Sequence, residues 1–430
     1  MASGFLSEFS PCMRGGNDAM IKGENTKMTI SAFNPISLAG IPLKNRMIRS
    51  ATYEGMADEK GFPTEKLKKL YINLAKGNVG AIITGYAGIQ ADGRVSNAMT
   101  MIDHDDKIPV LREITNSVHQ HETPIILQIA HCGRQTRSKI TGLPTVAPSA
   151  VRNMLFREDK PKALSEEGIT AIIDNFVAAI VRAKRAGFDG VQLHLAHGYL
   201  LSDFLSSHAN RRTDRWGGSI ENKYRIVGEI FKRAKDKVDD YPMLVKMNAY
   251  DGRRKGMRIE EAVVIARMLE TSGCAAIEVS CGCVEDGLYT IRGEKLPVEA
   301  VVKYNFNFKN YPAFAKKAIV WFSKTFLKTL KPLLKYNLNA AMQIKKAVNI
   351  PVIVVGGINN VDDVEDIIAN NKADFVSMSR PFIIEPDIVS KFKNRTQTTS
   401  KCIMCNFCVI TIEKEPLKCR YGKLPKTKNA

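Results

Sequence analysis

Eight short apolar runs, separated by amphipathic segments, are the feature that most constrains the fold of this 430-residue chain. Most runs are continuous rather than alternating, which is typical of parallel strands buried on both faces. Eight strands that alternate with helices predict a (β/α)8 TIM barrel, with a doubly wound open sheet as the alternative. The expected strands are Met47–Thr52, Gly80–Thr84, Pro124–Ile129, Gly190–Leu195, Met243–Met247, Ala275–Ser280, Pro351–Val355 and Asp374–Ser379.

Capping residues support the helices expected between these strands. Ser219 opens the sequence S-I-E-N, in which a serine N-cap precedes Glu221 in the first turn. Gly187 follows Ala186, as expected for a glycine just beyond a helix end. The clearest helical patterns cover Lys66–Lys76, Lys107–His121, Glu166–Ala186, Ser219–Val238, Ile259–Ser272 and Val361–Asn370.

The composition is that of an ordinary globular protein, with 44% hydrophobic and 25% charged residues. No run approaches the ~18 apolar residues of a membrane span. Residues 1–28 lack the apolar core of a secretory signal. We therefore expect a cytoplasmic protein without a transmembrane segment. Its expected parts are a disordered extension at 1–28, a barrel at 29–395 and a basic, cysteine-rich tail at 396–430.

Two segments hold 13 of the 19 excess positive charges. Residues 300–335 contain eight Lys and no Asp or Glu, and residues 414–430 contain six basic residues and one Glu. The first segment lies in an insertion at about 285–340, after the sixth strand, where aromatic residues and Lys interleave at helical spacing. Three interpretations remain open: a solvated helical hairpin packed on the barrel, a lid that recruits anionic substrates, and an interfacial membrane helix.

The most informative motif follows the fourth strand. That strand ends in His194, and His197 and Tyr199 lie in the loop behind it. Residues just past the carboxyl ends of barrel strands form the active site. Two imidazoles can bind one oxyanion, and a nearby phenol can deliver a proton. A loop with buried, hydrogen-bonded histidines is the simpler interpretation of the same residues.

This motif, H-x-x-H-G-Y-L, and the run N-R-R-T-D-R-W-G-G-S-I-E-N-K-Y-R resemble the Old Yellow Enzyme family of FMN-dependent ene-reductases. The resemblance covers most of Phe33 to Glu385, apart from the insertion. It implies FMN at the carboxyl ends of the strands and NAD(P)H as a co-substrate. It also implies reduction of the C=C bond of an α,β-unsaturated carbonyl by hydride from flavin N5. His194 and His197 would bind the carbonyl oxygen, and Tyr199 would protonate the α-carbon.

Further motifs occur in the family's order. The resemblance places Gln128 at the flavin pyrimidine edge and Lys246 near flavin N1 and O2, where many members have Arg. Two departures are Ala51, often Pro in the family, and Ser379, often Gly. The flavin contacts that the resemblance implies are Ser50, Ala51, Thr52, Tyr53, Gly85, Tyr86, Gln128, Lys246, Gly356, Gly357, Ser379 and Arg380.

Four of the nine cysteines follow the barrel as Cys402-x2-Cys405-x2-Cys408-x10-Cys419. Closely spaced thiolates suit an iron–sulfur cluster or tetrahedral zinc. The group is similar to the [4Fe–4S] site of 2,4-dienoyl-CoA and enoate reductases, whose last two gaps are each one residue longer. A metal site at these cysteines is expected on that resemblance, and structural thiols remain the alternative.

Three functions remain open beside the FMN-dependent ene-reductase. An iron–sulfur-assisted enoate or dienoyl-CoA reductase is favoured by the terminal cysteines. An FMN barrel acting on RNA, similar to tRNA dihydrouridine synthases, is favoured by the basic charge, but those enzymes use a Cys acid. The third is a non-catalytic flavoprotein. We expect a small-molecule enone or enoate as the partner and no nucleic acid, and we leave a homo-oligomer open.

Overall fold

A computed structural model of the protein describes residues 30–156, 159–286, 292–293, 298–305, 308–326, 332–412 and 415–420. The predicted disordered extension at 1–28 lies outside these described residues.

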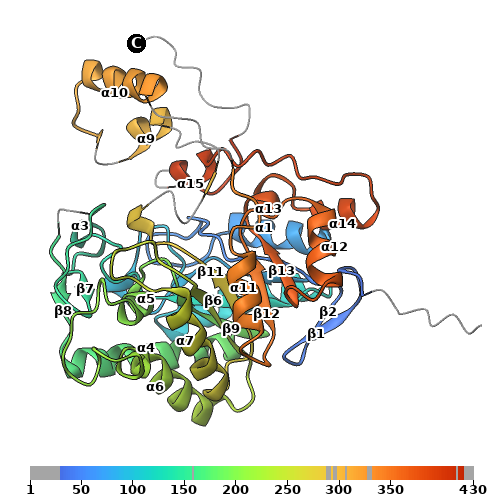
Figure 1. The fold of residues 1–430 in the computed structure, drawn as a ribbon, viewed down its shortest axis with the longest axis horizontal. Helices are drawn as coiled ribbons and strands as arrows, with labels where there is room; N and C mark the ends of the chain where they lie inside the picture. Colours follow the sequence, from blue (N-terminus) through green and yellow to red (C-terminus); the bar gives the residue numbers. More distant parts are fainter. Residues whose placement is uncertain are drawn as a thin grey trace, which may run out of the picture.

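Eight parallel strands close into a barrel, as predicted (Figure 1). The sheet runs in the order β4-β3-β13-β12-β11-β10-β9-β6-β5, and pairing of β4 with β6 closes it. This closure excludes the open-sheet alternative. The short strand β5 (Ala87–Gly88) pairs beside β6 as an addition to the barrel. The barrel strands are β3 (Met47–Arg49), β4 (Ala81–Ile83), β6 (Ile125–Ala130), β9 (Gly190–Leu195), β10 (Met243–Asn248), β11 (Ile277–Ser280), β12 (Val352–Val355) and β13 (Phe375–Met378).

Helices on the outside of the barrel account for the continuous apolar strands, because they bury the strands' outer faces. Ser219 caps its helix as predicted, by accepting from the backbone N–H of Asn222 at 3.2 Å. Gly187 has the positive φ of 83° that a residue past a helix end requires. The longer helices around the barrel are α1 (Glu65–Lys76), α2 (Ile108–His119), α4 (Glu166–Arg185), α6 (Ile220–Val238), α7 (Ile259–Thr271), α11 (Leu338–Lys345) and α12 (Val361–Ala369).

A β-hairpin that the sequence did not predict packs against one end of the barrel. Strands β1 (Ile36–Leu38) and β2 (Ile41–Leu43) pair antiparallel. Their buried side chains form one cluster with residues from the starts of the barrel strands, such as Ala81 and Leu244. The amino-terminal end of the barrel is therefore covered, which leaves the carboxyl end for a site.

Several other short elements were also missed, because their length gives no periodic signal. They are β7 (Val146–Ala147), β8 (Lys162–Ala163), η1 (Ala91–Gly93), η2 (Asp105–Lys107), η3 (Val284–Asp286), α3 (Ser138–Thr141), α5 (Leu200–Leu205), α13 (Arg380–Ile384), α14 (Ile388–Lys393) and α15 (Phe407–Thr411).

The insertion after the sixth barrel strand is helical, as predicted. It contains α9 (Val298–Tyr304) and α10 (Ala313–Phe326), and α9 packs on both α10 and α15. Figure 1 shows the pair of helices standing apart from the barrel, with α15 between them and it. Among the described helices, none is long and apolar enough to cross a membrane.

Candidate active site

Most of the predicted site residues gather at the carboxyl ends of the barrel strands, around a cavity of about 130 Å³. Others lie beside the cavity and are joined to it by hydrogen bonds and ring contacts. The predicted residues that line the cavity are Ser50, Ala51, His197, Lys246, Gly356, Gly357, Ser379 and Arg380.

His194 and His197 bring two imidazole rings together at this end of the barrel. His194 lies on β9, and His197 follows in the left-handed conformation, with φ of 66°. The two ring centroids are 5.1 Å apart and the rings are nearly perpendicular. The backbone N–H of Ala196 donates to Nδ1 of His194 at 3.2 Å, so Nε2 carries the proton and can act as a donor. Nε2 of His197 lies 2.8 Å from Oγ of Ser280.

Both imidazoles are neutral at physiological pH. Burial, together with the neighbouring His197 ring and the charge of Lys246, holds the pKa of His194 well below its usual range. Burial and the charge of Lys246 lower the pKa of His197 to about 3. A neutral imidazole has a single N–H to donate. The pair can therefore stabilise a developing oxyanion through hydrogen bonds, without a proton transfer from either ring.

Tyr199 adds a buried phenol to the two imidazoles. Its ring centroid lies 4.7 Å from that of His194, and its hydroxyl donates to the hydroxyl of Tyr86 at 2.9 Å. Tyr86 in turn stacks on Tyr53, with ring centroids 5.2 Å apart. Burial raises the pKa of both Tyr199 and Tyr86. The phenol of Tyr199 therefore keeps its proton at neutral pH, which is the protonation state that a general acid needs before it reacts.

A buried carboxylate that the sequence analysis missed lies under the cavity. Glu278 on β11 is paired in register with Lys246 on β10, and its Oε2 lies 3.2 Å from Nζ of Lys246. Ser50, Ser377 and Gln192 donate to the same carboxylate at 2.6, 2.7 and 2.8 Å. Burial alone would raise the pKa of Glu278, but Lys246 and these hydrogen bonds lower it overall. An acidic residue inside the apolar run I-E-V-S was the signal that could have found it.

Gln128 provides a test of whether these residues fit a flavin. Its Nε2 donates to Oε1 of Gln192 at 2.6 Å, and Gln192 donates onward to Glu278. Its own Oε1 is buried and has no hydrogen-bond partner among the described residues. Such an orphaned acceptor costs about 1–3 kcal/mol unless a donor meets it. An N–H at the pyrimidine edge of a flavin has the required chemistry, and buried Lys246 supplies the expected cation nearby.

The predicted phosphate end of the site is shaped by two glycines. Gly356 and Gly357 have φ of 125° and 71°, which side chains rarely adopt. A Cβ on Gly356 would lie 2.5 Å from the ring of Tyr336. Arg380, at the start of α13, donates through Nη1 to Oδ1 of Asn406 at 2.7 Å. The cysteine-rich tail therefore reaches this end of the cavity and holds its arginine.

Three predicted flavin contacts have protein partners. The hydroxyls of Ser379 and Thr52 lie 2.7 Å apart. The backbone N–H of Gly85 donates to Oε1 of Glu54 at 2.9 Å, and the same oxygen is paired with Arg49 at 2.8 Å. These contacts fix the loops after the first two barrel strands. Flavin contacts at these positions stay predictions.

The four terminal cysteines line one small cavity, of about 20 Å³, together with Arg380 and Asn406. The spacing therefore predicted their proximity. However, within the part of the chain that the structure describes, no group of three or more His, Cys, Asp or Glu side chains is arranged to hold a metal ion. A metal site at Cys402, Cys405, Cys408 and Cys419 stays a prediction.

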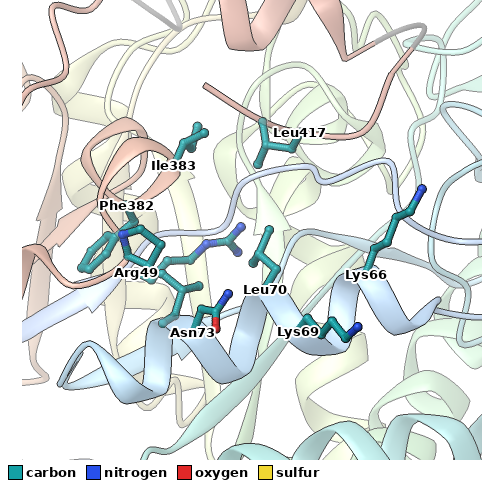
Figure 2. Close-up of a pocket in the computed structure, with 10 residues that line it drawn as sticks. Arg49, Lys66, Lys69, Leu70, Asn73, Phe382, Ile383 and Leu417 are labelled. Atoms are coloured by element: carbon teal, nitrogen blue, oxygen red, sulfur yellow. The ribbon is translucent and has the colours of Figure 1, made fainter. Parts of the chain in front are cut away.

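A second cavity, of about 340 Å³, lies outside the barrel beside α1 and α13 (Figure 2). Leu70, Phe382, Ile383 and Leu417 give it apolar walls. The guanidinium of Arg49 also borders it, but that group already donates to Glu54 and to the backbone of the strand-end loops. The reactive side chains described above are absent from the residues that line this cavity, so it is not the candidate active site.

Comparison with known families gives a match over most of the chain. The profile of the NADH:flavin oxidoreductase / NADH oxidase family matches residues 31–284 and 294–399. The break between the two matched ranges falls at the start of the insertion. The histidine pair, Tyr199 and the phosphate-end glycines all lie within the matched ranges.

Individual relatives agree with this match. The NADH oxidase of Thermoanaerobacter brockii is 34% identical over 380 residues, which cover 87% of this chain and 52% of that protein. The chain thus spans about half the length of that relative. The 4,4'-dithiodibutanoate disulfide reductase of Rhodococcus erythropolis is 30% identical over 398 residues, covering 90% of this chain and 94% of that protein.

Solved structures show the same architecture. The old yellow enzyme homologue from Zymomonas mobilis superposes with a TM-score of 0.68 at 23% identity, covering 87% of this chain and 95% of the other. At this identity the likeness establishes the barrel fold and not the reaction.

Proposed function

This chain belongs to the NADH:flavin oxidoreductase / NADH oxidase family, and we propose that it is an FMN-dependent enzyme that uses NAD(P)H to reduce activated C=C bonds. The substrate class is an α,β-unsaturated carbonyl compound, such as an enone or enoate. The observation that carries this proposal is the grouping of two neutral imidazoles with one protonated phenol at the barrel mouth. A cytoplasmic location remains a prediction from the sequence.

His194 and His197 would bind the carbonyl oxygen of the substrate. Their N–H groups can donate to this oxygen, and the hydrogen bonds strengthen as negative charge develops on it. Because both rings are neutral, they would stabilise the enolate without protonating it. Tyr199, whose ring packs against His194, would then deliver its proton to the α-carbon.

The flavin would be held by groups that the fold already orients. When bound, FMN supplies the hydride for the reaction. Gln128 would accept a hydrogen bond from the pyrimidine edge, and Lys246 would place positive charge beside it. Gly356, Gly357 and Arg380 would bind the phosphate, because bare backbone and a guanidinium both suit that anion. These assignments rest on the orphaned oxygen of Gln128 and on the shared cavity.

The purified protein is expected to be yellow and to release FMN on denaturation, because no covalent link to the flavin is required. Absorbance spectra and chromatography of the released flavin would measure its identity and amount. A colourless protein that could not be reconstituted with FMN would contradict the proposed cofactor. Stopped-flow mixing of the reduced enzyme with enones, enoates and a disulfide would then define the acceptor class. The disulfide is included because one relative is named a disulfide reductase.

The terminal cysteines lead to a separate expectation. Among the described residues, the side chains of these cysteines are not arranged to hold a metal ion, so we assign no reaction step to a metal there. Cys405→Ser is expected to leave the NAD(P)H-to-enone reaction largely intact, because a bound FMN would supply the hydride and the reaction would need no second redox centre. Iron and sulfide analysis of anaerobic preparations, made beside the activity assay, would test this. If removing iron abolished enone reduction while FMN stayed bound, an iron–sulfur-assisted reductase would be the better description.

A further inference from the structure

The helix α10 exposes an unusual set of side chains. Tyr311, just before the helix, and Phe314, Trp321 and Phe322 within it are 48%, 75%, 65% and 56% exposed. Among the residues that the structure describes, every exposed aromatic side chain lies in this short segment. Single exposed apolar residues are common on protein surfaces, but a concentration of aromatics at one place marks an interaction site.

The exposed side chains share one side of the helix. Lys317 and Ala318 each lie three or four residues from both Phe314 and Trp321, and all four residues are exposed. Side chains at this spacing lie on one helical face. The neighbouring Phe322 widens the face. The result is an aromatic face, with Lys317 within it, on a helix that stands apart from the barrel (Figure 1).

The charge of residues 300–335 indicates which kind of surface the exposed face of α10 binds. Residues 300–335 carry eight Lys and no acidic residue, so the segment suits a uniformly negative partner surface. They also contain no Arg. Arg is the residue that usually recognises single phosphates through paired hydrogen bonds, whereas Lys acts as a point charge. Lys beside Trp and Phe is typical of a helix that lies in the plane of an anionic membrane surface.

The insertion begins beside the active site. The backbone N–H of Val284 donates to the carbonyl of His197 at 2.9 Å. Next to it, the buried carboxylate of Glu285 pairs with Arg134 at 2.8 Å. The helical hairpin therefore rises from the carboxyl end of the barrel, where the candidate cavity lies.

We propose that α10 binds the surface of an anionic lipid bilayer, with Phe314, Trp321 and Phe322 in the interfacial layer and the lysines over the headgroups. The helix lies on the membrane and does not cross it. This surface is separate from the proposed reaction, because none of its side chains lines the candidate cavity. The membrane-binding surface would therefore remain even if the enzyme proved to reduce a different class of acceptor.

Binding can be measured with the protein's own fluorescence. The chain has two tryptophans, and the other, Trp216, is only 2% exposed. Mixed with phosphatidylcholine–phosphatidylserine vesicles, the full chain is expected to sediment with them. The Trp321 emission should shift to the blue and be quenched by brominated lipid. Vesicles of phosphatidylcholine alone should give neither response, and added salt should weaken the binding.

Substitutions on α10 and elsewhere test whether this helix, and not another exposed apolar site, binds the vesicles. Phe314→Ser combined with Trp321→Ser should abolish sedimentation, while Val264→Ser, an exposed apolar site on α7, should leave it unchanged. Lys316→Gln and Lys317→Gln should each lower the partition coefficient about five-fold. This factor corresponds to the loss of about 1 kcal/mol of electrostatic attraction per lysine at an anionic membrane surface. Flavin absorbance and circular dichroism would verify that the variants fold.

Three outcomes would overturn the proposal. The first is equal binding to neutral and anionic vesicles, or binding to neither. The second is loss of binding in Lys423→Gln/Lys426→Gln, which changes charge in the tail, together with retention in the α10 variants. The third is binding of single-stranded RNA, sensitive to the α10 variants, without binding to vesicles. That result would identify a nucleic-acid surface instead.

Discussion

Tyr199→Phe is expected to slow reoxidation of the reduced enzyme by an enone about 10²–10⁴-fold, while flavin reduction by NAD(P)H stays near the wild-type rate. The variant removes one oxygen, and with it the proton that would go to the α-carbon. It keeps the ring that packs 4.7 Å from His194, so the site should hold its shape. Anaerobic stopped-flow absorbance would measure the two half-reactions separately.

Tyr86→Phe is the matched control for this variant. It removes the hydroxyl that accepts the hydrogen bond from Tyr199, but it leaves the proton of Tyr199 in place. We expect a much smaller effect on reoxidation than in Tyr199→Phe. An equal loss in both half-reactions of Tyr199→Phe would reject the role of proton donor.

Lys246→Met is expected to lower the free energy of unfolding by about 3–5 kcal/mol, because it leaves the buried carboxylate of Glu278 without its cation. Urea unfolding of the FMN-free protein would measure this loss independently of flavin binding. The pKa of Glu278 would rise in the variant, since burial would no longer be offset by Lys246. The deficit should therefore shrink as the pH falls through that raised pKa and the carboxyl becomes neutral.

Two controls test the origin of this loss. The double variant Lys246→Met/Glu278→Gln removes both charges and should recover part of the stability. Lys372→Met removes a cation from a half-exposed ion pair with Asp366 and should cost no more than about 1 kcal/mol. A double variant that was no more stable than the single one would show that the uncompensated charge is not the cause.

The strands and long helices of the fold were predictable because their signals are local. Continuous apolar runs identified all eight barrel strands, and Ser219 and Gly187 marked helix boundaries that the structure reproduces. The hairpin of β1 and β2 was not predicted, since each strand has three residues and its role is to cover the barrel end. That role depends on contacts between residues far apart in the chain.

The site was predictable only in part, for the same reason. His194, His197 and Tyr199 lie within six residues, so their proximity follows from the sequence. Glu278 became part of the site only because β10 and β11 are neighbours, which sets it beside Lys246. The contact of the tail with Arg380 joins residues 26 positions apart, and nothing in the local pattern indicates it.

The hydrogen bond from Val284 to the carbonyl of His197 has a thermodynamic consequence. It ties the first residues of the insertion to one of the two groups that would meet the substrate oxygen. When two binding events share such a link, any influence of one on the other is reciprocal and of equal size. A ligand that shifted the His197 loop would therefore change the affinity of α10 for the membrane by some factor. Membrane binding would change the affinity for that ligand by the same factor. Measuring vesicle partitioning with and without a tightly bound phenol would give that factor. Measuring the affinity for the phenol with and without vesicles should give the same value.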